Sequence, residues 1–410
     1  MLKRNPRIAN LSSGYLFPEI SKRRAAYAKA HPEAKIISLG IGNTTEPLTP
    51  HIVSALHAEV TRLGTPEGYS GYGDETGLAA LRAKIAEVLY ENRVSADEVF
   101  ISDGAKCDIG RLQYLFGPDA KVCVQDPAYP VYVDGSVMAG AAGPAASGAS
   151  GYAGIVYMPC TAANGFFPDL ALVPENSLIY FCSPNNPTGA VATREQLTSL
   201  VRVAREKSSI IIFDSAYSAF IRDPALPRSI FEIPGARECS IEVNSFSKPI
   251  GFTGVRLGWS IVPRELSFAD GTPVAADWTR LMTTIFNGAS NIAQQGGLAS
   301  LDEQGIAETL ALTDYYLENA RLIRETLSGE NFRNAGVSIF GGDNAPYVWA
   351  RFPGRKSWEI FDLILDSCHV VCTPGAGFGP AGEEFIRFSS FGHRAQVSEA
   401  CSRLSKLILS

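Results

Sequence analysis

The sequence predicts an α/β fold with a mostly parallel central sheet and a second, smaller α+β domain. Short apolar runs alternate with helix-length segments between about residues 75 and 265. That alternation is typical of a parallel sheet with helices on both faces. After about residue 290 the pattern changes to a long helical region followed by short strands. We therefore expect a large domain over 45–290, and a small domain formed by an N-terminal arm (1–44) together with 291–410.

The strands expected in the large domain are short and apolar. Helix-length segments such as Gly77–Arg93 and Thr193–Lys207 separate several of them. The predicted strands are Val99–Ser102, Val122–Gln125, Gly154–Met158, Leu178–Cys182, Ile210–Asp214, Cys239–Asn244 and Leu257–Val262. Residues 139–154 are rich in Gly, Ala and Ser, and we expect them to form a surface connection.

The expected small domain begins with a long helical region, Ala293–Leu327. Short apolar runs at Val337–Phe340, Tyr347–Arg351 and Ile386–Ser389 are its predicted strands. A run of helix followed by a run of strands favours an α+β arrangement. We expect the N-terminal segment to pack against this domain.

Charge and composition argue against several classes of protein. Lys and Arg number 36 against 42 Asp and Glu, so the formal net charge is −6. This balance argues against nucleic-acid and acidic-membrane partners. The chain has no apolar stretch of the roughly 18 residues that a membrane span needs. The basic residues near the start are not followed by the apolar run of a secretory signal.

The eight cysteines include no CxxC pair, which favours reduced thiols and a cytoplasmic location. Cys368, His369 and Cys372 form the only metal-like cluster, beside an apolar stretch that is predicted to be a strand. A structural zinc site needs four well-spaced ligands, so no metal is expected.

The segment Asn244–Trp259 is the richest in chemically useful residues. It places Lys248 after Ser245 and Ser247, and it places a Gly-containing turn and Arg256 after the lysine. Hydroxyls, backbone N–H groups and a planar guanidinium are donors that suit a phosphate. An amine beside such a site could form a Schiff base with an aldehyde. The alternative is a loop with a solvated lysine and a structural arginine.

Two predicted strands end in polar side chains. Asp214 ends the run Ile210–Asp214, where a carboxylate is costly unless it is paired, and a protonated pyridine nitrogen is a suitable partner. Asn186, in Ser183–Gly189, follows another strand at the edge where open α/β sheets bind ligands. The alternatives are a capping aspartate and an ordinary turn.

Two further segments carry candidate ligand contacts. Residues Ser102–Lys106 join a strand to a helix, whose first N–H groups can bind an anion. Tyr129, in Asp126–Tyr132, could stack on a flat ring. A tyrosine of the hydrophobic core is the alternative for Tyr129.

Four motifs, in order along the chain, resemble the fold-type-I aminotransferases that depend on pyridoxal 5′-phosphate (PLP). They are DPAYP at 126–130, SPNNPTG at 183–189, IIFDSAY at 211–217 and SFSKPIGFTGVRLGW at 245–259. Their spacings also fit, and the likeness covers nearly the whole chain. The resemblance implies the aspartate-aminotransferase fold, PLP as cofactor, and a homodimer whose active sites lie at the subunit interface.

The resemblance also implies residue roles. Lys248 would be the catalytic residue that joins the cofactor aldehyde, Asp214 would pair with the pyridinium nitrogen, and Arg387 would bind the substrate α-carboxylate. Tyr217 and Asn186 would bond the ring's phenolic oxygen, and Tyr129 would stack on the ring. The residues expected to contact the cofactor are Tyr72, Ala105, Lys106, Tyr129, Asn186, Asp214, Tyr217, Ser245, Ser247, Lys248, Arg256 and Asn287. The phosphate would be held by Ser245, Ser247, Arg256 and the N–H groups of Ala105 and Lys106.

Finer features resemble one subgroup, the LL-diaminopimelate aminotransferases of lysine and peptidoglycan-precursor synthesis. The segments are Tyr15–Phe17, Gly40–Asn43, Gly71–Gly77, Asp103–Lys106 and Phe286–Ser290. In that subgroup Tyr72 would reach the phosphate from the partner subunit, and Glu75 would face the distal ammonium of the substrate. The expected substrate contacts are Tyr15, Gly42, Glu75, Lys106, Tyr129, Asn186, Asn287 and Arg387.

Three other functions are weighed against that one. The first is an aminotransferase for aromatic or small neutral amino acids, and the second is a PLP-dependent lyase of the same fold. The third is a transcription regulator built on this fold, which would need a DNA-binding domain with basic recognition helices. Only about 40 residues precede the GIGN segment, which disfavours the regulator. The fold alone does not choose among these functions.

Overall fold

The structure is a computed structural model that describes residues 2–11, 16–40, 42–146 and 151–409. Its main sheet has seven strands in the order β2-β8-β7-β6-β5-β3-β4. The strands are β2 (Val99–Ser102), β3 (Lys121–Asp126), β4 (Ile155–Pro159), β5 (Ser177–Cys182), β6 (Ile210–Asp214), β7 (Ser240–Ser245) and β8 (Gly258–Ile261). Only β8 runs antiparallel to its neighbours, β2 and β7. The predicted, mostly parallel sheet is therefore confirmed, with strand ends within about one residue of those expected.

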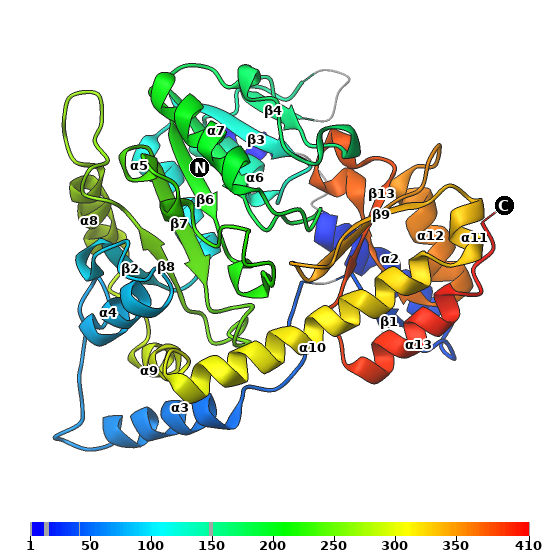
Figure 1. The fold of residues 1–410 in the computed structure, drawn as a ribbon, viewed down its shortest axis with the longest axis horizontal. Coiled ribbons are helices and arrows are strands. Elements are labelled where there is room, and N and C mark those ends of the chain that lie inside the picture. Colours follow the sequence, from blue (N-terminus) through cyan, green and yellow to red (C-terminus); the bar gives the residue numbers. More distant parts are fainter. Residues whose placement is uncertain (1, 12–15, 41, 147–150, 410) are drawn as a thin grey trace.

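Helices cover both faces of this sheet (Figure 1). Alternate residues of β6 show why, because Ile211 and Phe213 enter one apolar core whereas Ile212 enters the other. The first core is completed by α3 (Pro50–Leu63), α4 (Ala79–Val88), α7 (Arg194–Glu206) and α9 (Asn291–Ala299). The second is completed by α5 (Ala105–Phe116), α6 (Val131–Ala139) and α8 (Val274–Ile285).

A second, antiparallel sheet of four strands lies beside the first, in the order β12-β13-β10-β9. Its strands are β9 (Ser338–Gly341), β10 (Tyr347–Arg351), β12 (Thr373–Pro374) and β13 (Phe385–Ser389), and a small parallel pair is formed by β1 (Ile37–Ser38) and β11 (Val370–Val371). The helices around them are α2 (Leu16–Ala30), α10 (Glu303–Leu327), α11 (Glu330–Asn334), α12 (Ser357–Cys368) and α13 (Arg394–Leu404). This part has its own core, so the expected smaller α+β unit is present.

The expected long helical region over Ala293–Leu327 is two helices. α9 ends at Ala299, and α10 begins at Glu303 because the Asp302 side chain caps it, accepting the Gly305 N–H at 2.8 Å. The α9 residue Ala293 packs in the core of the main sheet, whereas the α10 residue Ile323 packs in the core of the smaller one. α10 therefore leads from the end of α9, beside the main sheet, to the core of the smaller one, as Figure 1 shows.

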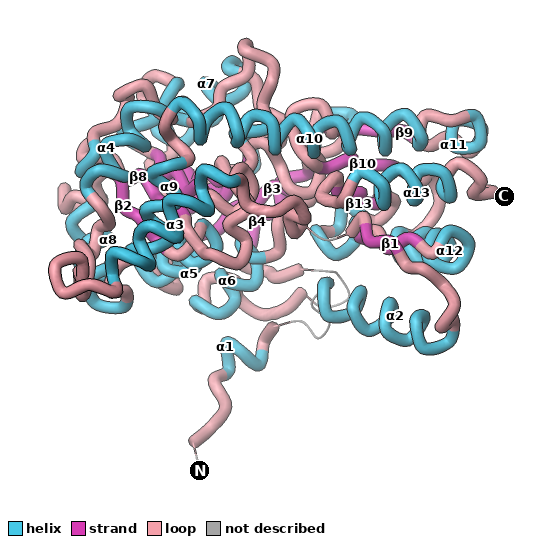
Figure 2. The backbone as a smooth tube through the Cα atoms, turned by 90° about the horizontal axis from the view of Figure 1, so that it is seen from below, coloured by secondary structure: helices cyan, strands magenta, loops and turns pink. Residues whose placement is uncertain are grey.

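The N-terminal segment contacts both parts of the molecule. α2 packs in the smaller core, as expected. α1 (Pro6–Ala9) lies apart from it (Figure 2), and the Arg7 guanidinium donates to the Ala139 carbonyl at the end of α6 at 2.7 Å. α1 therefore contacts the part of the chain that was expected to form the large domain. The expected division into 45–290 and 1–44 plus 291–410 stays a prediction.

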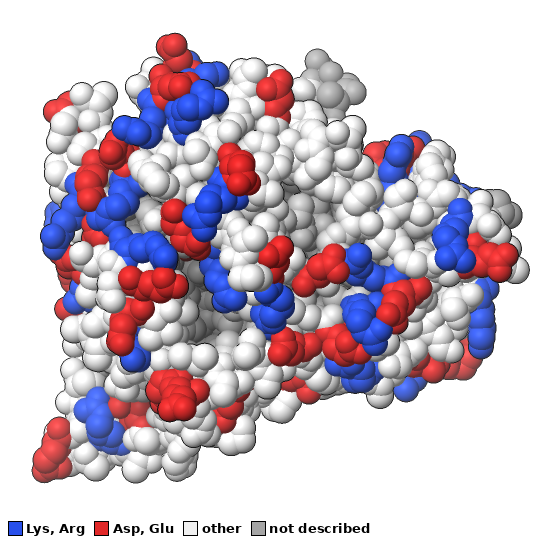
Figure 3. Space-filling view, in the orientation of Figure 1, with Lys and Arg blue, Asp and Glu red and all other residues white. Residues whose placement is uncertain are grey.

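Basic and acidic side chains are interspersed on the face shown in Figure 3. Most ion pairs of the described residues lie at the surface, such as Arg202 with Glu206 at 3.1 Å. Surface pairs of this kind contribute little to stability, so the apolar cores are the main source of it. Within the described residues, no helix is both long enough and apolar enough to cross a membrane.

Candidate active site

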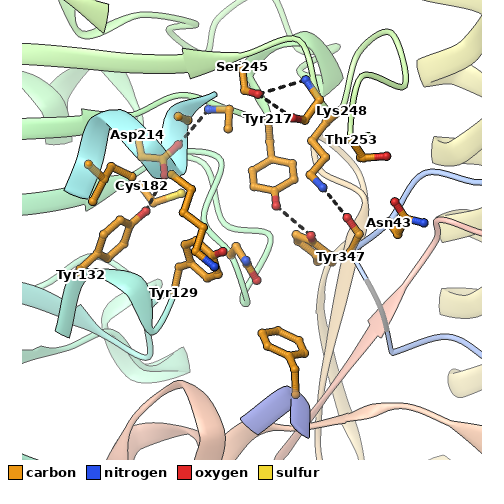
Figure 4. Close-up of a pocket in the computed structure, with 18 of the residues that line it drawn as sticks. Asn43, Tyr129, Tyr132, Cys182, Asp214, Tyr217, Ser245, Lys248, Thr253 and Tyr347 are labelled. Atoms are coloured by element: carbon orange, nitrogen blue, oxygen red, sulfur yellow. Dashed lines mark hydrogen bonds between the residues drawn. The ribbon is translucent and has the colours of Figure 1, made fainter. Parts of the chain in front are cut away.

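A cavity of about 420 Å³ lies at the carboxyl ends of the parallel strands, between the two sheets. Cys182, Asp214 and Ser245 reach it from the ends of β5, β6 and β7, and Tyr347 and Arg387 reach it from β10 and β13 (Figure 4). The sequence-predicted residues that line it are Gly42, Ala105, Lys106, Tyr129, Asn186, Asp214, Tyr217, Ser245, Ser247, Lys248, Arg256 and Arg387. The topology thus brings together residues that lie up to about 340 positions apart in the chain.

Lys248 follows β7 and extends into the cavity, where its ammonium donates to the Gly42 carbonyl. Burial lowers the pKa of this amine to about 8, and the nearby cations Arg387 and Arg256 act in the same direction. A Cβ at Gly42 would lie 2.7 Å from the Tyr347 hydroxyl, so a larger residue here would require Tyr347 to shift. The arrangement gives a lysine that is readily deprotonated near neutral pH, which suits a nucleophile or a base.

Asp214 is buried at the end of β6, and both of its oxygens are hydrogen-bonded. It accepts the Tyr132 hydroxyl at 2.7 Å and the Ala216 N–H at 3.1 Å. Burial raises the pKa of this carboxyl, whereas the two hydrogen bonds lower it. Asp214 can therefore hold a proton or face a cation, as the sequence predicted for a ring-nitrogen partner.

Donors for an anion gather between the end of β7 and the start of α5. The Ser245 hydroxyl bonds that of Ser247 at 2.9 Å, and Ser247 accepts from Arg256 at 3.2 Å. The first N–H groups of α5 have no partner within the helix. A Cβ at Gly104 would lie 2.3 Å from Nη2 of Arg256, so a glycine is needed where the guanidinium meets the helix start. The set fits a phosphate.

Arg387 is almost fully buried on the opposite side of the cavity. It donates to Asn186 Oδ1 at 2.7 Å and to the Gly40 carbonyl at 2.6 Å, and its Nε has no partner among the described atoms. Its guanidinium lies 4.4 Å from the ring centre of Tyr347. A buried, planar cation without a carboxylate beside it is suited to bind the carboxylate of a ligand.

The cavity also contains residues to which sequence reasoning gave no role. Tyr132, three positions after Tyr129, holds Asp214, and Tyr347 shares a hydrogen bond of 2.8 Å with Tyr217. Phe17, Asn43 and Thr253 also line the cavity. Four of these residues lie inside segments that the sequence analysis singled out, namely Tyr132, Phe17, Asn43 and Thr253. Their position in those segments was the signal that could have marked them as cavity residues. Tyr347 begins a predicted strand, and nothing local marked it.

Three expected site residues that the structure describes do not line the cavity. Tyr72 is 87% exposed, and Glu75 and Asn287 are exposed as well. They lie on neighbouring loops, because a Cβ at Gly288 would lie 2.9 Å from the Asp74 carbonyl. Tyr15 lies outside the described residues. Tyr72, Glu75 and Asn287 therefore do not line the cavity of their own chain.

The metal-like cluster of the sequence is not assembled into a site. The His369 ring bonds the Tyr27 hydroxyl at 2.8 Å, and Cys372 is fully buried. Across the ranges that the structure describes, no group of three or more His, Cys, Asp or Glu side chains could hold a metal ion.

Comparison with known proteins identifies the family. The family model "Aminotransferase class I and II" matches residues 34–404, which is most of the chain. The chain belongs to this aminotransferase family. A structure of aspartate aminotransferase from Thermus thermophilus, 20% identical, superposes with a TM-score of 0.83 over the whole of both chains. The expected aspartate-aminotransferase fold is thereby confirmed.

Several members of this aminotransferase family are similar over nearly their full length. The LL-diaminopimelate aminotransferase of Arabidopsis thaliana, described as chloroplastic, is 52% identical over 99% of this chain and 87% of its own. That of Protochlamydia amoebophila is 50% identical over 100% and 98%. The structure of L,L-diaminopimelate aminotransferase from Chlamydomonas reinhardtii is 53% identical, with a TM-score of 0.93 over 99% and 98%.

Proposed function

We propose that this aminotransferase binds PLP and interconverts LL-2,6-diaminopimelate and tetrahydrodipicolinate, with glutamate and 2-oxoglutarate as the other amino-group pair. This reaction belongs to lysine and peptidoglycan-precursor biosynthesis. The observation that carries the proposal is that an amine, a buried carboxyl, a set of phosphate donors and a buried guanidinium share one cavity. Relatives of 50–53% identity that bear this enzyme's name support the choice of substrate.

The cavity residues fit PLP, a flat pyridine ring that carries an aldehyde and a phosphate. Arg256, Ser245, Ser247 and the start of α5 would hold the phosphate. Arg256 has a φ of +71°, an uncommon backbone conformation for a residue other than glycine, and its guanidinium donates to the Ser247 hydroxyl of this cluster. When bound, PLP supplies an electron sink for charge that develops at the substrate Cα.

Lys248 would move the proton of the reaction. Because its pKa is lowered to about 8, the amine could take the proton from the substrate Cα as a general base and deliver it to C4′ of the cofactor as a general acid. Asp214 would keep the pyridine nitrogen protonated, since a buried carboxyl is stabilised by a cation beside it. Tyr132 holds the Asp214 carboxyl in place for this contact.

Arg387 would bind the α-carboxylate that all the proposed substrates share. Asn186 and the Gly40 carbonyl fix the orientation of its guanidinium. Lys106 is exposed at the cavity edge, with its ammonium 6.0 Å from the Tyr129 ring centre, and suits a second carboxylate. Two cations, Lys106 and Arg387, line the cavity, which favours a dicarboxylate over a neutral amino acid.

The remaining contacts would come from the second subunit of a homodimer. Tyr72, Glu75 and Asn287 are exposed on adjacent loops, and the exposed Tyr69 and Ile285 add apolar surface beside them. The loop before α4 is fixed, because Asn291 donates to the Ser70 hydroxyl at 2.7 Å. Such a preformed, partly apolar surface suits a self-complementary interface. We propose that Glu75 of one subunit faces the distal ammonium in the other subunit's cavity.

The substrate proposal is tested by comparing LL- and meso-diaminopimelate as donors to 2-oxoglutarate. Inversion of the distal carbon exchanges the positions of its ammonium and carboxylate, so the meso isomer should react poorly. A site that pairs buried charges can reject a mismatched analogue by factors of about 10⁴. Equal rates with both isomers would contradict the proposed specificity. Turnover of tyrosine or alanine without diaminopimelate would place the protein among the other aminotransferases of the family.

The Glu75 assignment has its own test. Glu75→Gln should slow the diaminopimelate half-reaction much more than the glutamate half-reaction, because glutamate has no distal ammonium. Glu67→Gln is the matched control, since Glu67 is also exposed on the stretch between α3 and α4. Equal loss in both half-reactions would remove Glu75 from the distal site.

We propose that the protein works in a reducing compartment such as the cytoplasm. All eight cysteines lie in the described part of the chain, and each is a free thiol. Its expected partners are small amino and keto acids and a second copy of the chain. The net charge of −6 gives no support for a nucleic-acid partner.

A further inference from the structure

A buried acid lies behind the cavity, and the proposed reaction does not use it. Glu242, in the middle of β7, is about 1% exposed. Its Oε1 accepts the Tyr90 hydroxyl at 2.8 Å and the Ser215 hydroxyl at 2.7 Å. Its Oε2 accepts the Ser229 hydroxyl at 2.6 Å and the Ile230 N–H at 3.2 Å. The carboxyl therefore joins three chain segments that are distant in sequence.

One of these segments is the turn that follows β6 and presents two of the proposed cofactor contacts. Ser215 directly follows Asp214, and the next N–H, that of Ala216, bonds the Asp214 carboxyl at 3.1 Å. The Ser215 N–H also donates to the Val243 carbonyl at 3.0 Å, and its carbonyl accepts the Ser218 N–H at 2.8 Å. The orientation of Asp214 thus depends on where Ser215 and Ala216 lie.

β7 holds this turn with two side chains on the same face. Residues 242 and 244 are two positions apart in the strand, so both point the same way. Glu242 holds Ser215 at the start of the turn, and the Asn244 amide donates to the Ser218 hydroxyl at 3.3 Å. Tyr217 lies between these two fixed points and bonds Tyr347 in the cavity.

We propose that Glu242 is a positioning residue of the transamination, which acts through Ser215 to fix the turn carrying Asp214 and Tyr217. The inference rests on the proposed function, because it concerns how these two side chains meet the cofactor. Glu242 does not line the cavity itself. A carboxylate is the side chain that can accept all four donors at once, since two oxygens offer about four acceptor positions.

Loss of the hydrogen bond between Glu242 and Ser215 would disturb the turn, because Ser215 is fully buried. The Glu242 carboxyl is buried, and a buried donor left without its partner costs more than an exposed one. Glutamine has the same shape but places an N–H group against donors. The Ile230 N–H can only donate, and the Tyr90 hydroxyl already accepts the Trp259 indole N–H at 2.9 Å. Because the Ile230 N–H on the Oε2 side can only donate, Glu242→Gln should place its amide nitrogen at the position of Oε1, where it faces both Ser215 and Tyr90.

The test compares Ser215→Ala with Ser260→Ala. Ser260 is a matched control, because its hydroxyl is equally buried, lies in β8 of the same sheet and has no hydrogen-bond partner among the described atoms. The first measurement is amide hydrogen exchange of the cofactor-free protein over the peptide containing 214–218. We expect exchange there to be about tenfold faster in Ser215→Ala and in Glu242→Gln, and unchanged in Ser260→Ala.

The second measurement is the PLP dissociation constant, followed by kcat and KM per site of bound PLP. Ser215→Ala should raise the dissociation constant and lower kcat about tenfold, with KM for the amino donor nearly unchanged, because Arg387 is untouched. Equal exchange and equal kcat in Ser215→Ala and Ser260→Ala would overturn the positioning role. A wild-type chain that binds no PLP would instead overturn the proposed function, whatever the exchange result.

Discussion

Burial determines the chemistry of the two titratable side chains at the centre of the cavity. The amine of Lys248 has a pKa lowered to about 8, and the pKa of the Asp214 carboxyl is raised. Both shifts favour the uncharged form, as expected when charged groups leave water. Bound PLP would place an anionic phosphate beside the cation Arg256. It would also place a cationic ring nitrogen beside Asp214, which would favour the charged form of this carboxyl.

The role of Lys248 leads to a direct prediction. Lys248→Ala should lose covalently attached PLP, its yellow absorbance and nearly all transamination. Borohydride reduction of the wild-type protein with PLP, followed by peptide mapping, should place the label on the peptide that contains Lys248. Lys106 also lines the cavity and is the internal control. A label on Lys106 would contradict the assignment.

The lowered pKa of Lys248 predicts a pH dependence for cofactor attachment. Only the neutral amine attacks an aldehyde, and with a pKa of about 8 in place of 10.5 the neutral form accumulates as pH rises through 8. The rate of PLP attachment to the cofactor-free protein should rise about tenfold per pH unit below 8 and level off above about 9. Stopped-flow absorbance measures it. A rate that keeps rising to pH 10, as for a free lysine side chain, would refute the shift.

For single residues, the sequence motifs located many that line the cavity, but they did not show which of these residues contact one another. Ser245, Ser247, Lys248 and Arg256 lie within one short segment, so one pattern revealed them all. The Tyr347 contact with Tyr217 joins residues 130 positions apart, and only the folded chain brings them together. Glu242 was expected only as one residue of a short strand. Its role was missed because its three hydroxyl partners come from three separate segments of the chain, which only folding brings together.

Among the elements, α10 has the clearest dependence on a single side chain. Asp302 caps its first turn through the Gly305 N–H, and it also bonds the His51 ring in α3 at 2.7 Å. One residue therefore stops α9 from continuing into α10 and ties the start of α10 to α3. Proximity of the Asp302 carboxylate to the positive end of the helix dipole adds to this stabilisation.

Asp302→Ala should destabilise the protein by about 0.5–2 kcal/mol, the usual range for loss of an N-cap. Asp302→Asn should retain most of the stability, because asparagine caps equally well. Equilibrium unfolding in urea at one fixed protein concentration measures both variants, since dimerisation would contribute to the free energy of unfolding. Glu303→Ala, one residue further on and exposed, is the control. A loss in Asp302→Ala no larger than in this control would contradict the capping role.

Element prediction succeeded where a buried strand lay between clear turn signals. Val99–Ser102, Ile210–Asp214 and Tyr347–Arg351 were predicted at their observed bounds. The break between α9 and α10 was missed, because the helical period continues across residues 300–302 and the cap is a single aspartate. β1 and β11 were not predicted as a pair, since each has only two residues and they join positions more than 300 apart.

For the whole molecule, the exposed loops that carry Tyr72, Glu75 and Asn287 make the proposed dimer testable by complementation. One chain carries Lys248→Ala, and the other carries Tyr72→Ala with Glu75→Gln. Each homodimer should be nearly inactive. A mixed dimer places the intact Lys248 of one chain opposite the intact Tyr72 and Glu75 of its partner, so one of its two sites should work. A refolded 1:1 mixture, in which about half of the dimers are mixed, should therefore regain about a quarter of the wild-type activity. Sedimentation and activity of refolded mixtures measure this.

The control for that experiment uses the two variant homodimers. Each is refolded alone, and the two are then combined under conditions in which they do not exchange subunits. If the mixed dimers gain no activity, each cavity is complete within one chain. If the Tyr72→Ala, Glu75→Gln homodimer is fully active, these side chains contribute nothing to the reaction. Either result would overturn the shared site while leaving the family assignment intact.

The helix α10 also has a mechanical consequence. From its cap at Asp302 to Asn319 it spans 17 residues, a rigid arm of about 26 Å. The Asn319 amide hydrogen-bonds the backbone just after Arg387, donating to the Ser390 carbonyl at 3.0 Å and to the Gly392 carbonyl at 2.8 Å. A tilt of about 5° about the capped end would carry Asn319 through about 2 Å. Because a binding group must be held to within about 0.5 Å, even so small a tilt would displace Arg387, and the packing of α10 therefore helps to set the position of that arginine.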